Sequence, residues 1–155
     1  MSETRRIADQ LKRAFEGEAW HGPSVKEALA GVTALQAAAR PIAAAHTIWE
    51  IAAHIAAWES VVRRRLAGEQ VSQPTDAEDW PPAGMGSERA WAELVVRLES
   101  GNRALREVVA AYDESRLDQP PPGGRTAAYH LMHGIIQHDL YHAGQIAVLR
   151  KGAGT

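Results

Sequence analysis

Apolar residues recur at helical spacing in four long stretches of this chain, and segments rich in proline and glycine separate the stretches. The four cover about residues 4–16, 47–68, 87 to at least 109, and 126–151. Residues three and four apart lie on one face of a helix, and no segment alternates for long as a strand would. The spacing therefore predicts an all-α protein, built as a four-helix bundle.

The connections between these stretches differ in length. A long crossover, residues 17–46, joins the first two predicted helices and carries two short helical pieces, one after Ser24 and one over Leu35–Arg40. The second long helix is expected to start at Thr47, because Thr47-Ile48-Trp49-Glu50 has the form of a capping box. Residues 69–86 read as a loop, and Trp80 within it is expected to be exposed or to cover a pocket. Residues 1–155 are expected to form one domain.

Composition narrows the class of protein. With 155 residues, 45% of them apolar and 23% charged, the chain resembles an ordinary soluble domain. A net charge of −2 and a pI near 6.4 argue against nucleic-acid binding. The absence of cysteine excludes disulfides, a protein thiolate nucleophile and a cysteine-ligated metal. No signal peptide or membrane span is recognisable, so a cytoplasmic protein without membrane contact is expected.

Three histidines form the main candidate site. His138 and His142 are four residues apart, so their imidazoles stand on one face of the last helix, which is its apolar face. His54 lies on the apolar face of the second helix. Each could be a lone core histidine, hydrogen-bonded to a backbone carbonyl or a nearby carboxylate, but the combination favours a shared metal ion. Three neutral imidazoles would leave such an ion, zinc or a similar one, an open position for water or substrate.

Other side chains are candidates for supporting roles. Gln145 and Glu50 lie one turn from the histidines of their own helices, where they would orient an imidazole or line the open position. Glu50 is the candidate catalytic residue, although it could be only the capping-box acid. Tyr141 would reach a substrate or simply pack, Trp58 shares the helix face of the second-helix histidine, and His21 could fold over the mouth of the site.

Three strings of residues, 46–59, 138–146 and 20–24, resemble the DinB-like superfamily, which includes the YfiT-type metal hydrolases. The resemblance covers nearly the whole chain. It implies an up-up-down-down four-helix bundle with a three-histidine metal site formed by His54, His138 and His142. It also implies zinc or nickel as the ion, and a homodimer.

Some members of that family are thiol-dependent transferases or isomerases, such as bacillithiol transferases and the mycothiol-dependent maleylpyruvate isomerase. The first hypothesis is therefore thiol-dependent S-transfer or isomerisation, in which the ion holds a low-molecular-weight thiol as thiolate. Arg125 or Arg40 would then bind carboxylates of that thiol. The substrate would be a small molecule.

Two further functions stay open. One is metal-dependent hydrolysis, which needs a base such as Glu50 near the ion. The other is a non-catalytic, stress-related metal-binding protein, or a structural metal clip. A structural site normally has four protein ligands, so it would require Glu50 or His21 to join the three histidines.

Overall fold

The computed structural model describes residues 1–84 and 86–154, and all regular structure in that part of the chain is helical. The elements in chain order are α1 (Glu3–Glu16), α2 (Val25–Leu29), α3 (Ala34–Ala38), α4 (Ile48–Leu66), α5 (Asp76–Asp79), α6 (Glu88–Ala110), the 3₁₀ helix η1 (Glu114–Arg116) and α7 (Ala128–Gly152). The expectation of an all-α chain is confirmed. Among these described helices, none is long and apolar enough to cross a membrane.

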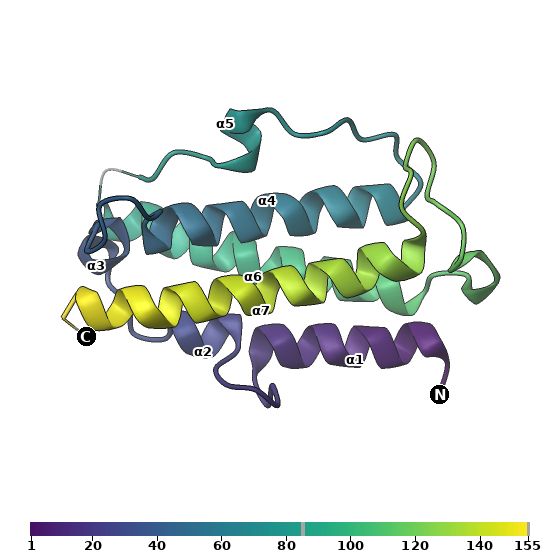
Figure 1. The fold of residues 1–155 in the computed structure, drawn as a ribbon, viewed down its shortest axis with the longest axis horizontal. Helices are drawn as coiled ribbons and strands as arrows, with labels where there is room; N and C mark the ends of the chain where they lie inside the picture. The colour runs from purple at the N-terminus through teal and green to yellow at the C-terminus, as the bar shows by residue number, and fades with distance from the viewer. Residues whose placement is uncertain (85, 155) are drawn as a thin grey trace.

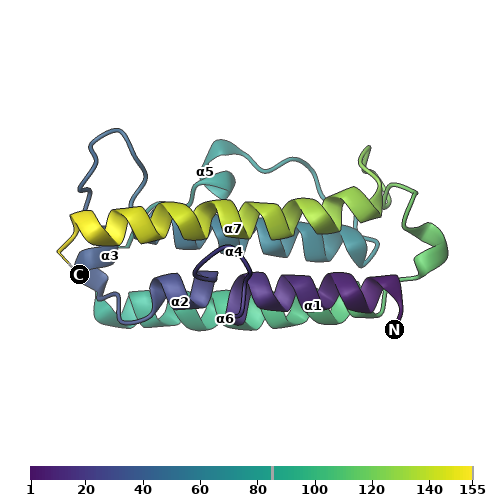
Figure 2. The ribbon, with the colours of Figure 1, turned by 60° about the horizontal axis from the view of Figure 1, so that its bottom comes forward.

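The four long helices α1, α4, α6 and α7 lie side by side, with α1 and α4 each packed against both α6 and α7 (Figures 1 and 2). In both views α1 and α7 run in one direction, and α4 and α6 run in the other. The chain order is therefore up, down, down, up, and the expected up-up-down-down order is not found. The predicted crossover between the first two long helices is present and holds α2 and α3.

Local sequence signals account for the ends of the helices. The Thr47 side chain accepts from the Glu50 backbone N–H at 3.1 Å, and Glu50 Oε2 accepts from the Thr47 N–H at 2.7 Å, which completes the expected capping box at the start of α4. The Ser87 side chain caps α6 by accepting from the Ala90 N–H at 3.3 Å, without a reciprocal acid. These caps satisfy backbone donors that the first turn of a helix leaves unpaired.

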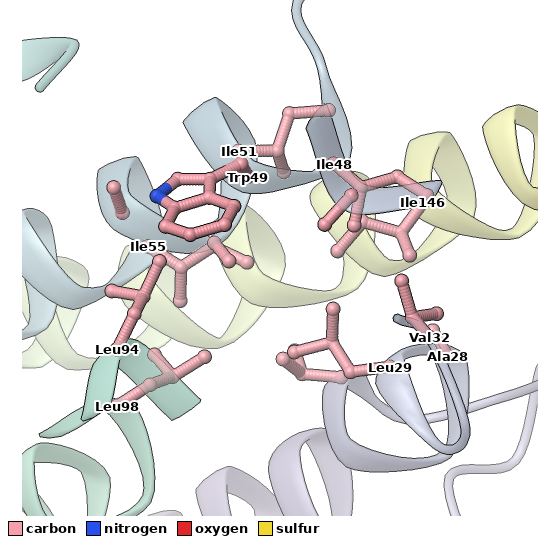
Figure 3. Packing of buried hydrophobic residues seen from close by; sticks show 14 of the residues in the cluster. Ala28, Leu29, Val32, Ile48, Trp49, Ile51, Ile55, Leu94, Leu98 and Ile146 are labelled. Carbon is pink, nitrogen blue, oxygen red and sulfur yellow. The ribbon is translucent and has the colours of Figure 1, made fainter. Parts of the chain in front are cut away.

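Two clusters of buried apolar side chains fill the interior. One lies toward the end where α2 and α3 pack, and includes Trp49 and Ile55 of α4, Leu94 and Leu98 of α6, and Ile146 of α7 (Figure 3). The other lies toward the opposite end, between α1 and the first half of α7. Burying one such leucine or isoleucine is worth about 1.5–3 kcal/mol, so these clusters hold the long helices in register.

The segment between α4 and α6 crosses the outside of α4, and we call residues 69–84 the strap. It carries α5, which lies against α4 (Figure 1). Near its end, Gly84 approaches the ring of Trp49 so closely that any Cβ at this position would overlap the ring. The strap is therefore fitted to α4, although the sequence pattern indicated only a loop.

Candidate metal centre

The three predicted histidines come together between α4 and α7. One ring nitrogen from each of His54, His138 and His142 lies within 4.8 Å of the other two. His54 Nε2 and His138 Nε2 are 2.9 Å apart. Two imidazole nitrogens bound to one tetrahedral zinc ion at about 2.0–2.1 Å are separated by about 3.3 Å. The three side chains therefore need only small shifts to hold a divalent ion.

Hydrogen bonds to the other ring nitrogens select the tautomers. His54 Nδ1 lies 2.6 Å from the carbonyl oxygen of Asp79, which can only accept, so Nδ1 carries the proton. His142 Nδ1 is 2.6 Å from Gln145 Oε1 and donates to it in the same way. Both rings therefore keep Nε2 unprotonated, as metal ligation requires, and His54 Nε2 faces His138.

His138 differs from the other two. Its Nε2 donates to His54 Nε2 across the cluster, and its Nδ1 is buried without a hydrogen-bond partner among the described residues. The nearest carboxylate oxygen, Asp139 Oδ1, is 3.7 Å away. His138 Nε2 could serve as a ligand only in the other tautomer, in which Nδ1 carries the proton. The orphaned nitrogen and the two prepared rings fit a metal ion.

Burial keeps the three rings uncharged at neutral pH. Desolvation lowers the pKa of His138 to about 4, and desolvation together with the nearby His138 lowers the pKa of His142 to about 4. The pKa of His54 is also lowered, mainly by desolvation, although the hydrogen bond to Asp79 opposes this. Neutral imidazole is the form that binds metal, so little proton competition is expected at pH 7.

Asp79, the last residue of α5, is a functional residue that the sequence reasoning missed. Besides its carbonyl contact, its Oδ1 lies 3.2 Å from His54 Nδ1 and accepts from Trp58 Nε1–H at 2.6 Å. Trp58, predicted near the site, therefore acts on His54 through Asp79. The only sequence signal was the Thr75–Glu78 capping box, which starts the short helix that presents Asp79.

Trp80 covers one side of the cluster. Its ring stacks on His54 with centroids 3.8 Å apart and planes 6° apart, and its other face stacks on His46 at 3.5 Å and 4°. The indole is therefore held between two imidazoles, one of them a candidate ligand. The sequence reasoning left Trp80 either exposed or covering a pocket, and the structure places it over the histidines.

Glu50 is engaged away from the three histidines. Its carboxylate completes the capping box with Thr47 and lies 3.0 Å through both oxygens from Arg40 Nη2. Partial burial, which raises the pKa of Glu50, is outweighed by the Thr47 N–H and by Arg40, so this pKa lies below its usual value. His46 Nδ1 is a further neighbour at 3.5 Å. Glu50 is thus held as an ionised partner of Arg40.

The other predicted residues occupy different places. Tyr141 is 66% exposed, and its ring centroid is 5.2 Å from that of His142. His21 is exposed and lines a hollow with α1 and with Ile136 of α7, outside the histidine cluster. Arg125 is exposed in the loop before α7, and the helical segment from Ala128 to His138 alone spans about 15 Å. Neither His21 nor Arg125 joins the site in this structure.

A second group of polar side chains is buried beside the histidines. Glu59 of α4, Asn102 of α6 and Asp139 of α7 have no exposed surface, and Asn102 Nδ2 donates to Glu59 Oε1 at 2.6 Å. Desolvation raises the pKa of Glu59 well above its usual value, with a further rise from Asp139, and desolvation raises the pKa of Asp139 to about 8. The two carboxyls therefore hold at least one proton between them at neutral pH.

The sequence contained a signal for part of this group. Ala52, Ile55, Val62 and Leu66 are buried on one face of α4, and Glu59 occupies the same face at helical spacing. An acid at such a position needs a partner or a proton. Its neighbours on α6 and α7 could not be identified without the packing of the helices.

Comparison with known proteins places the chain in a family. No curated protein and no solved structure matches it. Residues 20–146, however, match the family model described as the DinB superfamily, and this range contains all three histidines. The match covers well over half of the chain and confirms the resemblance seen in the sequence. The chain belongs to the DinB superfamily.

Proposed function

We propose that this chain is a metal-dependent enzyme of the thiol-dependent S-transferase or isomerase kind, with His54, His138 and His142 as ligands of a zinc or nickel ion. Three neutral imidazoles converge on one point, and this observation carries the proposal. In the described part of the chain no further acidic or histidine ligand is grouped with them. Structural zinc sites normally have four protein ligands, whereas catalytic sites keep a position open. An open position supports a reaction in preference to a structural clip.

The chain's own residues would prepare this site. A divalent ion held by the three rings would lower the pKa of a bound thiol, so that the sulfur is a nucleophilic thiolate at neutral pH. Asp79 and Gln145 orient His54 and His142, and Trp80 shields His54 from water on one face. Because the chain contains no cysteine, the thiol must come from a small molecule.

The position of Glu50 favours thiol chemistry over hydrolysis. A hydrolytic site usually has a carboxylate base within hydrogen-bond reach of the attacking water. Glu50, the candidate base, is committed to Thr47 and Arg40. A thiolate needs no such base, because deprotonation precedes the reaction. Hydrolysis therefore ranks second.

We also propose that the protein is a homodimer, that residues 1–155 form a single domain, and that the protein is cytoplasmic.

The test begins with metal analysis of protein purified without a histidine tag, followed by replacement of the ion with Co(II). We expect about one ion per chain, and low-molecular-weight thiols should produce a cobalt–thiolate absorption band that saturates with concentration. His142→Ala protein serves as the control that lacks a ligand. Metal without any thiolate band would contradict the thiol proposal, and an unchanged metal content in His142→Ala would contradict the site itself.

A further inference from the structure

A hollow lies beside the candidate metal centre, between the start of α4 with its preceding loop and the outer face of α7. Its volume is about 570 Å³, within the range of about 300–1,000 Å³ that is usual for small-molecule sites. Ile42 and Ala45 of the loop form one wall, and Gly144 and Val148 of α7 form the other. We call it the loop–α7 pocket.

Two contacts connect this pocket to the histidines. Gln145 lines the pocket and accepts the hydrogen bond from His142 Nδ1. His46 lines it as well and stacks on Trp80, which in turn stacks on His54. A molecule in the pocket would therefore touch side chains that themselves contact candidate ligands. No other pocket described here contains a residue bonded to one of the three histidines.

The lining of the pocket is mostly apolar, and its polar side chains are His46, Tyr141 and Gln145. No Lys, Arg, Asp or Glu lines it, and the charged pair nearest its His46 wall, Arg40 and Glu50, is joined in an ion pair at 3.0 Å. Large apolar side chains are exposed on its walls: Ile42 at 48%, Tyr141 at 66% and Val148 at 58%. A group of exposed apolar side chains around a hollow marks a surface that a ligand covers.

We propose that the loop–α7 pocket binds the uncharged, apolar part of the thiol that reacts at the metal centre. This inference rests on the proposed function and gives its substrate class. It replaces the expectation that Arg40 or Arg125 binds carboxylates of the thiol, because Arg40 is neutralised by Glu50 and Arg125 lies elsewhere. A thiol with an apolar body should bind more tightly than one that carries several charges.

The experiment compares three thiols on the Co(II)-loaded protein: benzyl mercaptan, 2-mercaptoethanol and glutathione. Gly144→Leu fills the pocket, since a Cβ at Gly144 meets only open space. Gly144→Ala controls for the loss of glycine, and Gly134→Leu places the same side chain at another open position of α7 outside the pocket. Circular dichroism and the cobalt spectrum without thiol check the fold and the metal site of each variant.

In the unaltered protein we expect benzyl mercaptan to bind about ten- to a hundred-fold more tightly than 2-mercaptoethanol, from burial of its ring. Gly144→Leu should remove this preference and leave the Kd of 2-mercaptoethanol unchanged, whereas both control variants should retain it. An equal effect of Gly144→Leu on the two thiols, or tighter binding of glutathione than of benzyl mercaptan, would overturn the inference.

A second readout separates this inference from the proposed function. The neutral dye N-phenyl-1-naphthylamine fluoresces in apolar pockets and requires no metal. We expect it to bind the metal-free protein and to be excluded by Gly144→Leu. If no thiol reaches the cobalt but the dye behaves as expected, the thiol function fails and the apolar pocket stands. If the dye binds both proteins equally, or if its binding disappears as the protein self-associates in sedimentation experiments, the pocket assignment fails.

Discussion

Removing the Asp79 carboxylate tests whether the strap prepares the metal centre. Asp79→Ala removes the carboxylate oxygen that lies 3.2 Å from His54 Nδ1 and accepts from Trp58 Nε1–H at 2.6 Å. The backbone carbonyl of residue 79 is then positioned only by the remaining contacts of the strap. Loss of a group that orients a ligand histidine typically weakens metal binding by about 10- to 100-fold. That loss corresponds to about 1.4–2.7 kcal/mol of binding free energy.

The assay is competition for zinc with a chromogenic chelator, combined with nitrogen-15 NMR of the metal-free protein to determine the tautomer of His54. Asp76→Ala, on the exposed side of the same short helix, removes the same charge without touching a histidine. Asp79→Asn keeps an oxygen that can accept from Trp58 and should retain most of the affinity. Unchanged zinc affinity in Asp79→Ala, or an equal loss in Asp76→Ala, would refute a positioning role. Because the Asp79 backbone carbonyl remains in Asp79→Ala, the proton should stay on His54 Nδ1 in that variant.

Three other changes have defined outcomes. His138→Ala should abolish tight binding of divalent ions by calorimetry while the helical circular dichroism stays nearly unchanged; tight binding in this variant would remove His138 from the site. Glu59→Gln should flatten the dependence of stability on pH, measured by urea unfolding. In the unaltered protein the pKa values of Glu59 and Asp139 are raised, so the stability that their protonation gives is present below about pH 4 and is lost as the pH rises toward 8. An equally steep fall of the free energy of unfolding with pH in Glu59→Gln would contradict the shared proton. Gly84→Ala should lower the free energy of unfolding by about 1–3 kcal/mol, because the new Cβ overlaps the ring of Trp49. Gly101→Ala, in open space on α6, should not destabilise the protein. Equal effects of the two substitutions would argue against the close fit of the strap.

Local signals in the sequence were sufficient to predict the four long helices, although not the short helix α5. The caps at Thr47 and Ser87 and the apolar spacing of each segment depend on residues within one or two turns. The three histidines could be grouped for a related reason, since His138 and His142 share one helix face and His54 lies on the buried face of α4. These inferences needed no knowledge of how the helices are ordered in space.

The features that sequence reasoning missed depend on contacts between distant segments. The direction of α4 relative to α1 follows from the packing of whole helices, so periodicity could not give it. Asp79 reaches His54 from 25 residues away, across a segment that carries no long apolar pattern. The partners of Glu59 come from two other helices. In each case the residues were visible, but their neighbours were set by tertiary structure.

The strap follows from the direction of the helices. Because α4 and α6 run the same way, the chain leaving Leu66 must return along α4, whose 19 residues rise about 28 Å, before α6 can begin. Asp79 and Trp80 are carried over the histidines on that return path and are tethered at both ends. Their encounter with His54 is therefore intramolecular, with a high effective concentration set by the length of the connection. A flexible insert in this connection would lower the effective concentration of Asp79 and Trp80 at His54. It would leave the four packed helices intact.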